Sequence, residues 1–419
     1  MKILFVHQNF PGQFRHLAPA LVRQGHSVTA FAMNRNGVDG QDGVRLRRYR
    51  VARGSAQGVH PWLIDLESKV IRGEACFHEA TLLAREGWAP DLIIAHPGWG
   101  ESLFLKDVWP RAKLALYCEW YYQAEGWDTG FDIETYPTES SAVCRLRLKN
   151  LNNTLHAGAA DAAISPTQWQ ANSFPTPLRE RITVIHEGID TRRVCANPAA
   201  TLSIPLADGR SMEISRQDEV ITFVNRNLEP YRGFHVFMRA LPELLKRRPR
   251  ARVLIVGGDK TGYGAGPDKL GLGSTTWKEL LVREVRPLMS PAEWSRIHFL
   301  GNIPYANFLS LLQISTVHVY LTYPFVLSWS LLEAMSAECA IIGSDTGPVR
   351  EAIKDGETGL LVDFFDVKAL GDAICRLIET PDLRARLGAA ARSRAIAQYD
   401  LQTVCLPRQL EWVKRILSS

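Results

Sequence analysis

The sequence lacks paired cysteines and any long apolar run. Its seven cysteines occur singly, at positions 76, 118, 144, 195, 339, 375 and 405. Such spacing argues against a disulfide framework and against a Cys/His metal site, and it is typical of reduced thiols in the cytoplasm. No stretch reaches the roughly 20 apolar residues that span a bilayer, and the apolar run in MKILFVHQNF is too short for a signal peptide. We therefore expect a soluble, cytoplasmic protein, at most peripheral to the inner face of a membrane.

Dense blocks of one charge are also missing. The formal net charge is +5, and the longest basic cluster, Lys246-Arg247-Arg248, is better interpreted as the end of a helix than as a nucleic-acid-binding arm. We expect no nucleic-acid partner. The modest positive balance favours anionic ligands or an acidic membrane surface.

Several catalytic signatures are absent. The chain has no GxSxG elbow, no GxGxxG with an acidic partner, no DxD after a strand and no His/Asp/Glu cluster with metal spacing. Residues 261–269, TGYGAGPDK, resemble a phosphate loop but lack the Lys-Ser/Thr ending, which indicates a flexible loop. These absences argue against hydrolases, dehydrogenases and a metal-dependent mechanism, and we expect neither a metal nor a cofactor.

What the chain does contain is an alternation of short apolar runs with amphipathic segments, once in each half. KILFVHQ, DLIIAH and KLALYCEW belong to the first half; VITFVN, ARVLIVGG and CAIIGSD belong to the second. Continuous apolar runs separated by helices indicate buried parallel strands, so we predict an α/β protein with two Rossmann-like domains facing across a cleft. The expected boundaries are 1–190, an interdomain connection at 191–218, 219–395, and a C-terminal helix at 396–419.

Five residues stand where such sheets bind ligands, just beyond the carboxyl ends of strands. Gly12 opens the first helix, His96 ends DLIIAH, Arg226 and Arg232 follow VITFVN, and Glu333 lies in the helix after VHVYLTYP. Guanidinium groups clamp diphosphates, and a carboxylate accepts both hydroxyls of a ribose. Each residue also has a plain structural interpretation, as a turn glycine, a packed histidine, a surface arginine or a surface glutamate.

In their order and spacing these segments resemble the retaining glycosyltransferases of family four, which have the GT-B fold. The resemblance covers nearly the whole chain. Its specific part runs from residue 223 to residue 366 and includes FLGNIP, the LLEAM helix, IIGSDTGPVREAI and DGETGLLVDFFD.

The resemblance implies roles for individual residues of the second half. Arg226 and Arg232 would hold the diphosphate of a nucleotide sugar, although the family usually has lysine at the second place. Glu333 matches the second glutamate of the family's E-x7-E motif and would bind the ribose, and Ile303 would meet the base through its backbone. From the first half, Gly12 and His96 would face the diphosphate and the transferred sugar.

One position departs from the family pattern. Phe325 occupies the place of the first motif glutamate, and Val326-Leu327-Ser328 replace Gly-Phe-Gly. Three explanations remain open: the donor sugar presents an apolar edge, the backbone of residues 326–329 supplies the sugar contacts, or the site no longer catalyses. Phe325, Ser328 and Trp329 are therefore candidates for donor binding.

The acceptor side is indicated by YCEWYYQAEGWDTGFDIE, residues 117–134, which is rich in aromatic and acidic side chains. Because aromatic faces stack on sugar rings, Glu119, Trp120 and Tyr121 are acceptor-side candidates, and packed tryptophans are the competing interpretation. His186-Glu187 are lower-ranked cleft candidates.

The resemblance implies a hexosyltransferase-type enzyme that moves a sugar from a nucleoside-diphosphate sugar to a hydroxyl acceptor with retention of configuration. The leaving phosphate would help to take the acceptor proton, without metal or side-chain nucleophile. The expected setting is cell-surface polysaccharide or glycoconjugate synthesis, with a lipid-linked acceptor as one option. The alternative is a catalytically silent nucleotide-sugar or glycan-binding protein on the same scaffold; a pyridoxal-dependent phosphorylase finds no supporting segment.

Overall fold

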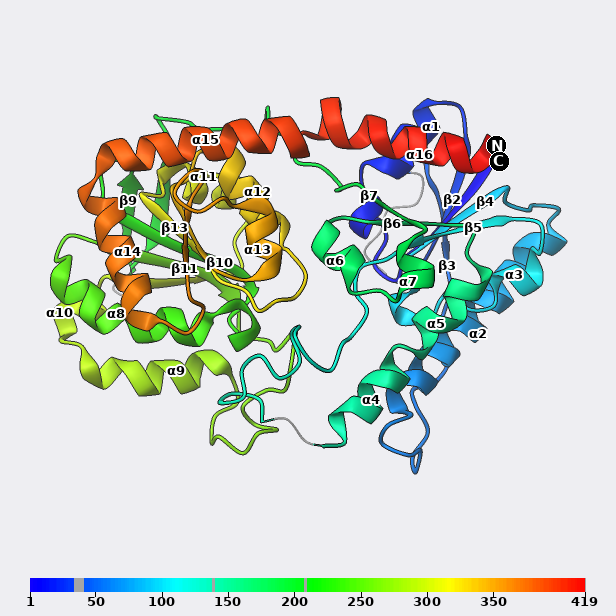
Figure 1. Ribbon diagram of the computed structural model, residues 1–419, viewed down its shortest axis with the longest axis horizontal. Helices are drawn as coiled ribbons and strands as arrows, with labels where there is room; N and C mark the ends of the chain where they lie inside the picture. The colour runs from blue at the N-terminus through cyan, green and yellow to red at the C-terminus, as the bar shows by residue number, and fades with distance from the viewer. Residues whose placement is uncertain (34–40, 138–139, 207–208, 419) are drawn as a thin grey trace. The chain divides into compact units, whose positions relative to one another are not determined.

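The computed structural model describes residues 1–33, 41–137, 140–206 and 209–418. The described residues form two compact units (Figure 1). Unit 1 comprises residues 1–129, 138–188 and 401–419, and unit 2 comprises residues 130–137 and 189–400. The backbone therefore passes between the units four times, after residues 129, 137, 188 and 400.

Unit 1 is built on a seven-stranded parallel sheet with strand order β3-β2-β1-β4-β5-β6-β7. The strands are β1 Lys2–Val6, β2 Ser27–Ala32, β3 Arg45–Arg48, β4 Leu92–Ala95, β5 Lys113–Tyr117, β6 Ala162–Ser165 and β7 Ile182–Val184. The helices are α1 Leu17–Arg23, α2 Ile64–Arg85, α3 Leu105–Val108, α4 Ala142–Lys149, α5 Leu151–Ala159, α6 Gln168–Asn172, α7 Thr176–Arg179 and α16 Leu406–Ser418.

The first strand shows why apolar runs predict buried parallel strands. Ile3 and Phe5 of β1 join a core that contains residues of α1 and α16, whereas Leu4 and Val6 join a second core that contains residues of α2. Because successive side chains of a strand point to opposite faces, both faces of the sheet need apolar residues. Helices accordingly cover both faces of the sheet in Figure 1.

Unit 2 repeats this plan with a six-stranded parallel sheet in the order β12-β11-β10-β13-β14-β15. The strands are β10 Val220–Asn227, β11 Arg252–Gly258, β12 Ile297–Gly301, β13 Val317–Tyr320, β14 Ile341–Ser344 and β15 Leu360–Val362. The helices are α8 Phe234–Arg247, α9 Trp277–Val285, α10 Pro291–Trp294, α11 Tyr305–Ile314, α12 Trp329–Ser336, α13 Gly347–Ala352, α14 Val367–Glu379 and α15 Pro381–Tyr399.

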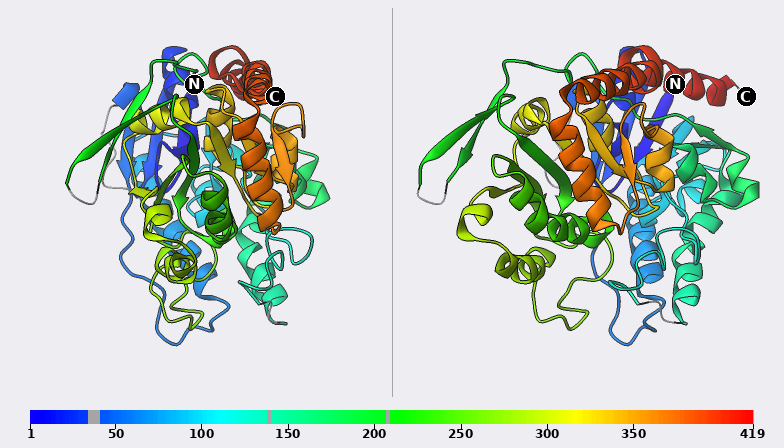
Figure 2. Two further views of the ribbon diagram at one scale, coloured as in Figure 1. Left: turned by 90° about the vertical axis from the view of Figure 1, so that its left-hand side faces the viewer. Right: turned by 60° about the vertical axis from the view of Figure 1, so that its left-hand side comes forward.

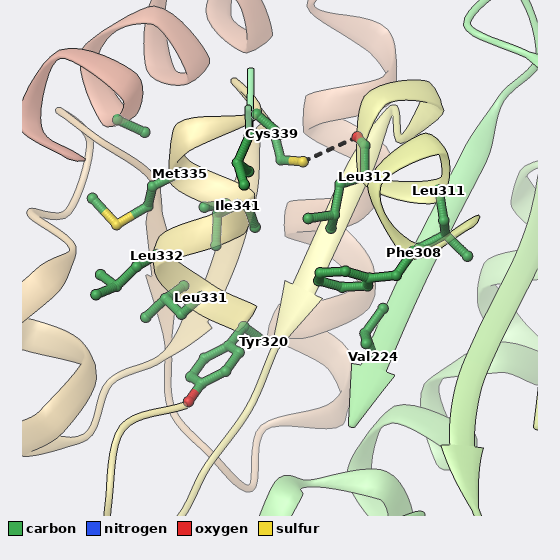
Figure 3. Packing of buried hydrophobic residues seen from close by; sticks show 14 of the residues in the cluster. Val224, Phe308, Leu311, Leu312, Tyr320, Leu331, Leu332, Met335, Cys339 and Ile341 are labelled. Atoms are coloured by element: carbon green, nitrogen blue, oxygen red, sulfur yellow. Dashed lines mark hydrogen bonds between the residues drawn. The ribbon is translucent and has the colours of Figure 1, made fainter. Parts of the chain in front are cut away.

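One face of this sheet packs against α11 and α12, as Figure 3 shows. Tyr320, Leu331 and Leu332 are fully buried there, and the Cys339 thiol donates a hydrogen bond to the carbonyl oxygen of Leu312 (3.2 Å). On α8, Phe237 stacks on Phe223 of β10, with ring centroids 4.4 Å apart. The α12 helix, which carries Glu333, is thus held by an apolar core.

The segment 191–218, interpreted from the sequence as a connection, contains an antiparallel hairpin of β8 Thr201–Pro205 and β9 Ser211–Ser215 and belongs to unit 2. Figure 2 shows this hairpin, in green, outside the parallel sheet. Leu202, Ile204 and Ile214 alternate with exposed residues and enter the unit 2 core. This short strand pattern was missed because Pro, Gly and Asp residues surround it.

Both predicted Rossmann-like sheets are confirmed. All seven cysteines are free thiols. Among the described residues, no helix is long and apolar enough to cross a membrane, and no group of three or more His, Cys, Asp or Glu residues is placed to hold a metal ion.

Candidate functional site

In unit 2 the candidate site lies at the carboxyl edge of the sheet, where β13 leads into α12 through residues 321–328. Two hydrogen bonds fix the end of this stretch: the Ser328 backbone N–H donates to the Tyr320 hydroxyl (2.9 Å), and the Ser328 side chain accepts from the backbone N–H of Ser330 (3.4 Å). Ser328 is therefore the N-cap of α12. Trp329, the first residue of that helix, is half-buried against the core.

Arg232, which follows β10, forms hydrogen bonds to residues 321–328. Its Nη1 donates to Oγ1 of Thr322 (2.8 Å) and to the carbonyl oxygen of Val326 (2.9 Å), and the residue is buried. The next residue, Gly233, has φ +70° and no room for a Cβ, which would lie 2.3 Å from Leu321. Part of the guanidinium expected to clamp a diphosphate is thus committed to the protein itself.

Arg226 differs from Arg232 in its surroundings. It lies near the end of β10, is exposed, and forms no hydrogen bond or ion pair with any residue in the described ranges. Its charge acts on the nearby Glu229 carboxyl, where burial raises the pKa and Arg226 lowers it, and an exposed guanidinium at the carboxyl edge of a parallel sheet is available to an anionic ligand.

Glu333 lies on α12 and accepts a hydrogen bond from the Tyr305 hydroxyl (2.7 Å) at its Oε1. Tyr305 begins α11, and the Arg193 guanidinium lies over its ring, 5.0 Å from the centroid. Ile303, just before α11, is half-buried and packs against the unit 2 core. Ile303, predicted to bind the base, thus lies two residues before the tyrosine that donates to Glu333, the residue predicted to bind the ribose.

Phe325 is buried, and its ring packs edge-on against Tyr231 (5.6 Å between centroids) and Tyr263 (5.0 Å). The aromatic side chain at this position is thus part of an aromatic cluster within unit 2. The sequence alone could not reveal these partners, which are far from residue 325 along the chain.

Glu229 is a site residue that sequence reasoning missed. Its carboxylate accepts hydrogen bonds from the backbone N–H groups of Gly262 (2.6 Å) and Tyr263 (2.9 Å), and burial raises the pKa of this carboxyl. Glu229 thereby holds the start of the glycine-rich loop 261–269, for which the sequence indicated only flexibility. The available signal was an acidic residue two positions after a strand and directly before a proline.

In unit 1, His96 lies at the carboxyl end of β4 and is buried between the stacked rings of Trp99 (4.3 Å) and Tyr117 (5.5 Å). Its Nδ1 accepts from the backbone N–H of Gly98 (3.1 Å), so the proton of the neutral ring is on Nε2. That nitrogen lies 3.3 Å from Oε2 of Glu119. The structure thus brings together two residues that were predicted separately.

A second histidine, His7, extends this arrangement. Its Nδ1 accepts from the backbone N–H of Asn9 (3.0 Å), its Nε2 donates to Oε1 of Gln13 (2.7 Å), and Nε2 of Gln13 donates to Glu119 (3.0 Å). Burial, and then the nearby His96, lower the pKa of His7 to about 3. Burial opposes ionisation of Glu119, but His96, His7 and Gln13 outweigh it and hold the pKa of this carboxyl below its usual value.

Gly12 belongs to the same corner of unit 1. Its φ is +47°, and a Cβ there would lie 2.4 Å from the His7 ring, so only glycine fits. Trp120 is buried edge-on against Trp127 (5.4 Å), and the half-buried Tyr121 donates its backbone N–H to Oγ of Ser173 (3.1 Å). Of the three acceptor-side candidates, Glu119 joins the His96 cluster.

His186 and Glu187 are buried rather than open to a ligand. Nδ1 of His186 accepts from the backbone N–H of Gly188 (3.0 Å), and its carbonyl oxygen accepts from Gln409 of α16 (2.9 Å). The Tyr117 hydroxyl donates to Glu187. The contacts of this pair tie β7, β5 and α16 together.

The two Rossmann-like parallel sheets make this an α/β protein that matches structures with the GT-B fold. The model of the glycosyl transferase family 4 group matches residues 24–194, and that of glycosyl transferases group 1 matches residues 209–394. The chain belongs to glycosyltransferase family 4, group 1.

Among curated proteins, the chain is 28% identical over 267 residues to D-inositol 3-phosphate glycosyltransferase of Corynebacterium efficiens, covering 63% of this chain and 57% of that protein. It is 24% identical over 435 residues to glycogen synthase of Mycobacterium tuberculosis, covering 96% and 92%. The matches to D-inositol 3-phosphate glycosyltransferase of Streptomyces scabiei and phosphatidyl-myo-inositol mannosyltransferase of Mycolicibacterium smegmatis span about half of those proteins, 50% and 52%.

Solved structures show the same fold. Anabaena Alr3699/HepE in complex with UDP and glucose matches with a TM-score of 0.69 at 17% identity, covering 99% of this chain and all of that one. Sucrose-phosphate synthase of Thermosynechococcus elongatus matches with a TM-score of 0.68 at 18% identity over the full length of both chains.

Proposed function

We propose that this protein is a retaining, hexosyltransferase-type enzyme that transfers a sugar from a nucleoside-diphosphate sugar to a hydroxyl acceptor. The supporting observation is the placement of Glu333, beside Tyr305, and of Arg226 and Arg232 at the carboxyl edge of the unit 2 sheet. There a carboxylate can accept ribose hydroxyls while guanidinium groups neutralise a diphosphate. The group 1 match over residues 209–394 includes all four residues.

In this proposal the bond between the anomeric carbon and the diphosphate oxygen breaks. The acceptor oxygen forms its bond to that carbon on the same face, and its proton passes to the departing diphosphate. Arg226 stabilises the charge that develops on the leaving group, and Arg232 contributes its remaining guanidinium N–H groups. His96, with its Nε2 proton, is a donor to a sugar hydroxyl or ring substituent.

UDP is the nucleotide we propose first, because the structural neighbour from Anabaena was solved with UDP and with UDP-glucose. We propose a polysaccharide or glycoconjugate as the acceptor class. Support comes from relatives named glycogen synthase and phosphatidyl-myo-inositol mannosyltransferase.

A thermal-shift panel tests the donor site. UDP, GDP, ADP, dTDP and their common sugars would be measured with the wild type and with Glu333→Ala. A ligand at a hundred times its Kd adds about 2.7 kcal/mol of stability, so binding is readily visible. A shift for one base that is lost in Glu333→Ala supports the proposal, and no shift with any nucleotide would contradict it.

Turnover then distinguishes the enzyme from a silent binding protein, which the buried Phe325 favours as the second candidate. Release of nucleoside diphosphate and an NMR spectrum of the product's anomeric centre would be recorded for the donor that binds. An α-linked product from an α-linked donor supports retention, whereas a β-linked one refutes it. Binding without turnover across acceptor classes would favour the silent protein.

A further inference from the structure

The segment Gly130–Pro137 belongs to unit 2, although the residues before and after it belong to unit 1. It contains no helix or strand, and its sequence, GFDIETYP, carries no periodic pattern. Its attachment to unit 2 therefore depends on side-chain contacts. Those contacts converge on the stretch that leads into α12.

Asp132 makes the polar contacts. This carboxylate is buried, accepts the hydroxyl of Tyr323, lies 3.3 Å from Nε2 of His235, and also accepts the backbone N–H of Thr135 (3.0 Å). A buried carboxylate is retained only where it is well bonded, so Tyr323 and His235, which lie outside the segment, contribute to keeping it in place.

Aromatic rings make the apolar contacts. Phe131 packs against Tyr323 (5.1 Å between centroids) and Phe364 (5.2 Å), and Tyr136 packs against Tyr231 (5.7 Å). Tyr231 in turn lies 4.5 Å from Tyr323 and accepts its backbone N–H (3.0 Å). The segment thus rests on Tyr323 both through the ring and through the hydroxyl.

Tyr323 lies between the two residues that accept hydrogen bonds from Arg232. It directly follows Thr322 and precedes Val326 by three residues, and these are the two residues that accept the hydrogen bonds of Arg232 Nη1. Restraining Tyr323 therefore restrains both acceptors, and with them the direction of the Arg232 guanidinium.

We propose that Gly130–Pro137 supports the anion-binding site of unit 2 without touching the anion, with Asp132 as a positioning residue that orients Arg232 through Tyr323. This inference rests on the proposed function in that the natural anion would be the diphosphate of the donor. Residues 130–134 belong to the stretch interpreted from the sequence as acceptor-side, and the inference gives them a role in binding the donor.

The test measures binding by calorimetry on the full chain with three probes: UDP, UMP and inorganic pyrophosphate. The variants are Asp132→Ala, Tyr323→Phe, Arg232→Ala and the double variant Asp132→Ala/Arg232→Ala. Glu134→Ala is the matched control, because Glu134 lies in the same segment with a 75% exposed side chain. Circular dichroism and Tm verify that each variant is folded.

Asp132→Ala and Tyr323→Phe should weaken UDP and pyrophosphate binding about tenfold, with a smaller loss for UMP, and Glu134→Ala should bind like the wild type. In the Arg232→Ala background, Asp132→Ala should have no further effect. Equal losses for UDP and UMP, or an undiminished effect of Asp132→Ala without Arg232, would overturn the inference.

The two proposals can fail separately. If the wild type binds pyrophosphate in an Asp132-dependent way but no nucleotide sugar, the donor assignment fails and the positioning role stands. If it binds nucleotide sugars but Asp132→Ala leaves their affinity unchanged, the positioning role alone is refuted. A wild type that binds neither class refutes both.

Discussion

Nη1 of Arg232 donates a hydrogen bond of 2.9 Å to the carbonyl oxygen of Val326, a residue 94 positions further along the chain. This bond joins the end of the β10 region to the stretch before α12. An arginine suits this position, because a guanidinium can bond to the protein backbone and still keep other N–H groups for a ligand.

Arg232→Lys should therefore be less conservative than it looks. A lysine provides one ammonium for both tasks, so we expect about tenfold weaker binding of the responding nucleoside diphosphate and a small loss of stability. Calorimetry with UDP and a urea titration would measure the two effects. Arg226→Lys is the comparison, because the Arg226 side chain forms no hydrogen bond or ion pair with a described residue; equal losses at both positions would contradict this explanation.

We expect Glu333 to be the residue that discriminates a ribose from a deoxyribose. The wild type should bind UDP more tightly than 2′-deoxy-UDP, and Glu333→Ala should bind the two alike, because the carboxylate that accepts the hydroxyl is gone. Tyr305→Phe, which removes only the hydroxyl that donates to Glu333, should give an intermediate preference. A preference for UDP that persists in Glu333→Ala would assign ribose recognition elsewhere.

Phe325→Glu would introduce the glutamate that the family resemblance predicts at this position, but we expect it to damage the protein. The carboxylate would replace a buried ring between Tyr231 and Tyr263, with loss of aromatic packing and burial of a charge, so the free energy of unfolding should fall by about 3 kcal/mol or more. Urea denaturation measures this, with Phe325→Leu as the apolar control. A stable Phe325→Glu variant with raised turnover would show instead that the position faces the sugar.

His7 should make the protein sensitive to acid. Its pKa is about 3 in the folded protein and near 6.5 in an unfolded chain, so the unfolded state binds more protons between these values. Stability should therefore fall as the pH drops from about 6.5 towards 3. His7→Gln should flatten this dependence by on the order of a few kcal/mol, whatever its stability at neutral pH. Unfolding free energies measured at several pH values, for both proteins, would show whether the slopes differ.

The fold was predictable because its strands and helices follow from short-range patterns of apolar and polar residues in the sequence. Runs such as ARVLIVGG are long enough and apolar enough to indicate a strand buried on both faces, and the turns that follow them indicate where ligands bind. The pairing of His96 with Glu119, by contrast, depends on β4 and β5 lying side by side, which places two separately plausible residues 3.3 Å apart.

Long-range contacts mark the limit of such prediction. Asp132 and Tyr323 are 191 residues apart, and no sequence pattern around either residue predicts their contact. For the same reason Phe325 is an anomaly in the sequence and an ordinary packed ring in the structure. The roles assigned to Gly12, His96, Arg226, Ile303, Ser328, Trp329 and Glu333 remain predictions, and the binding experiments address those of Arg226 and Glu333.

The route of the backbone also sets the order in which the protein can be completed during synthesis. Unit 2 has all its residues once Asp400 has been made, whereas the core of unit 1 needs Leu406, Trp412 and Ile416 from the last helix. Domains generally fold as the ribosome delivers them, and the N-terminal one is usually finished first. Here unit 1 begins first and is completed last, because its core lacks the residues of α16 until the end of synthesis. Ribosome-bound chains that stop before residue 401 should therefore be the most prone to aggregate.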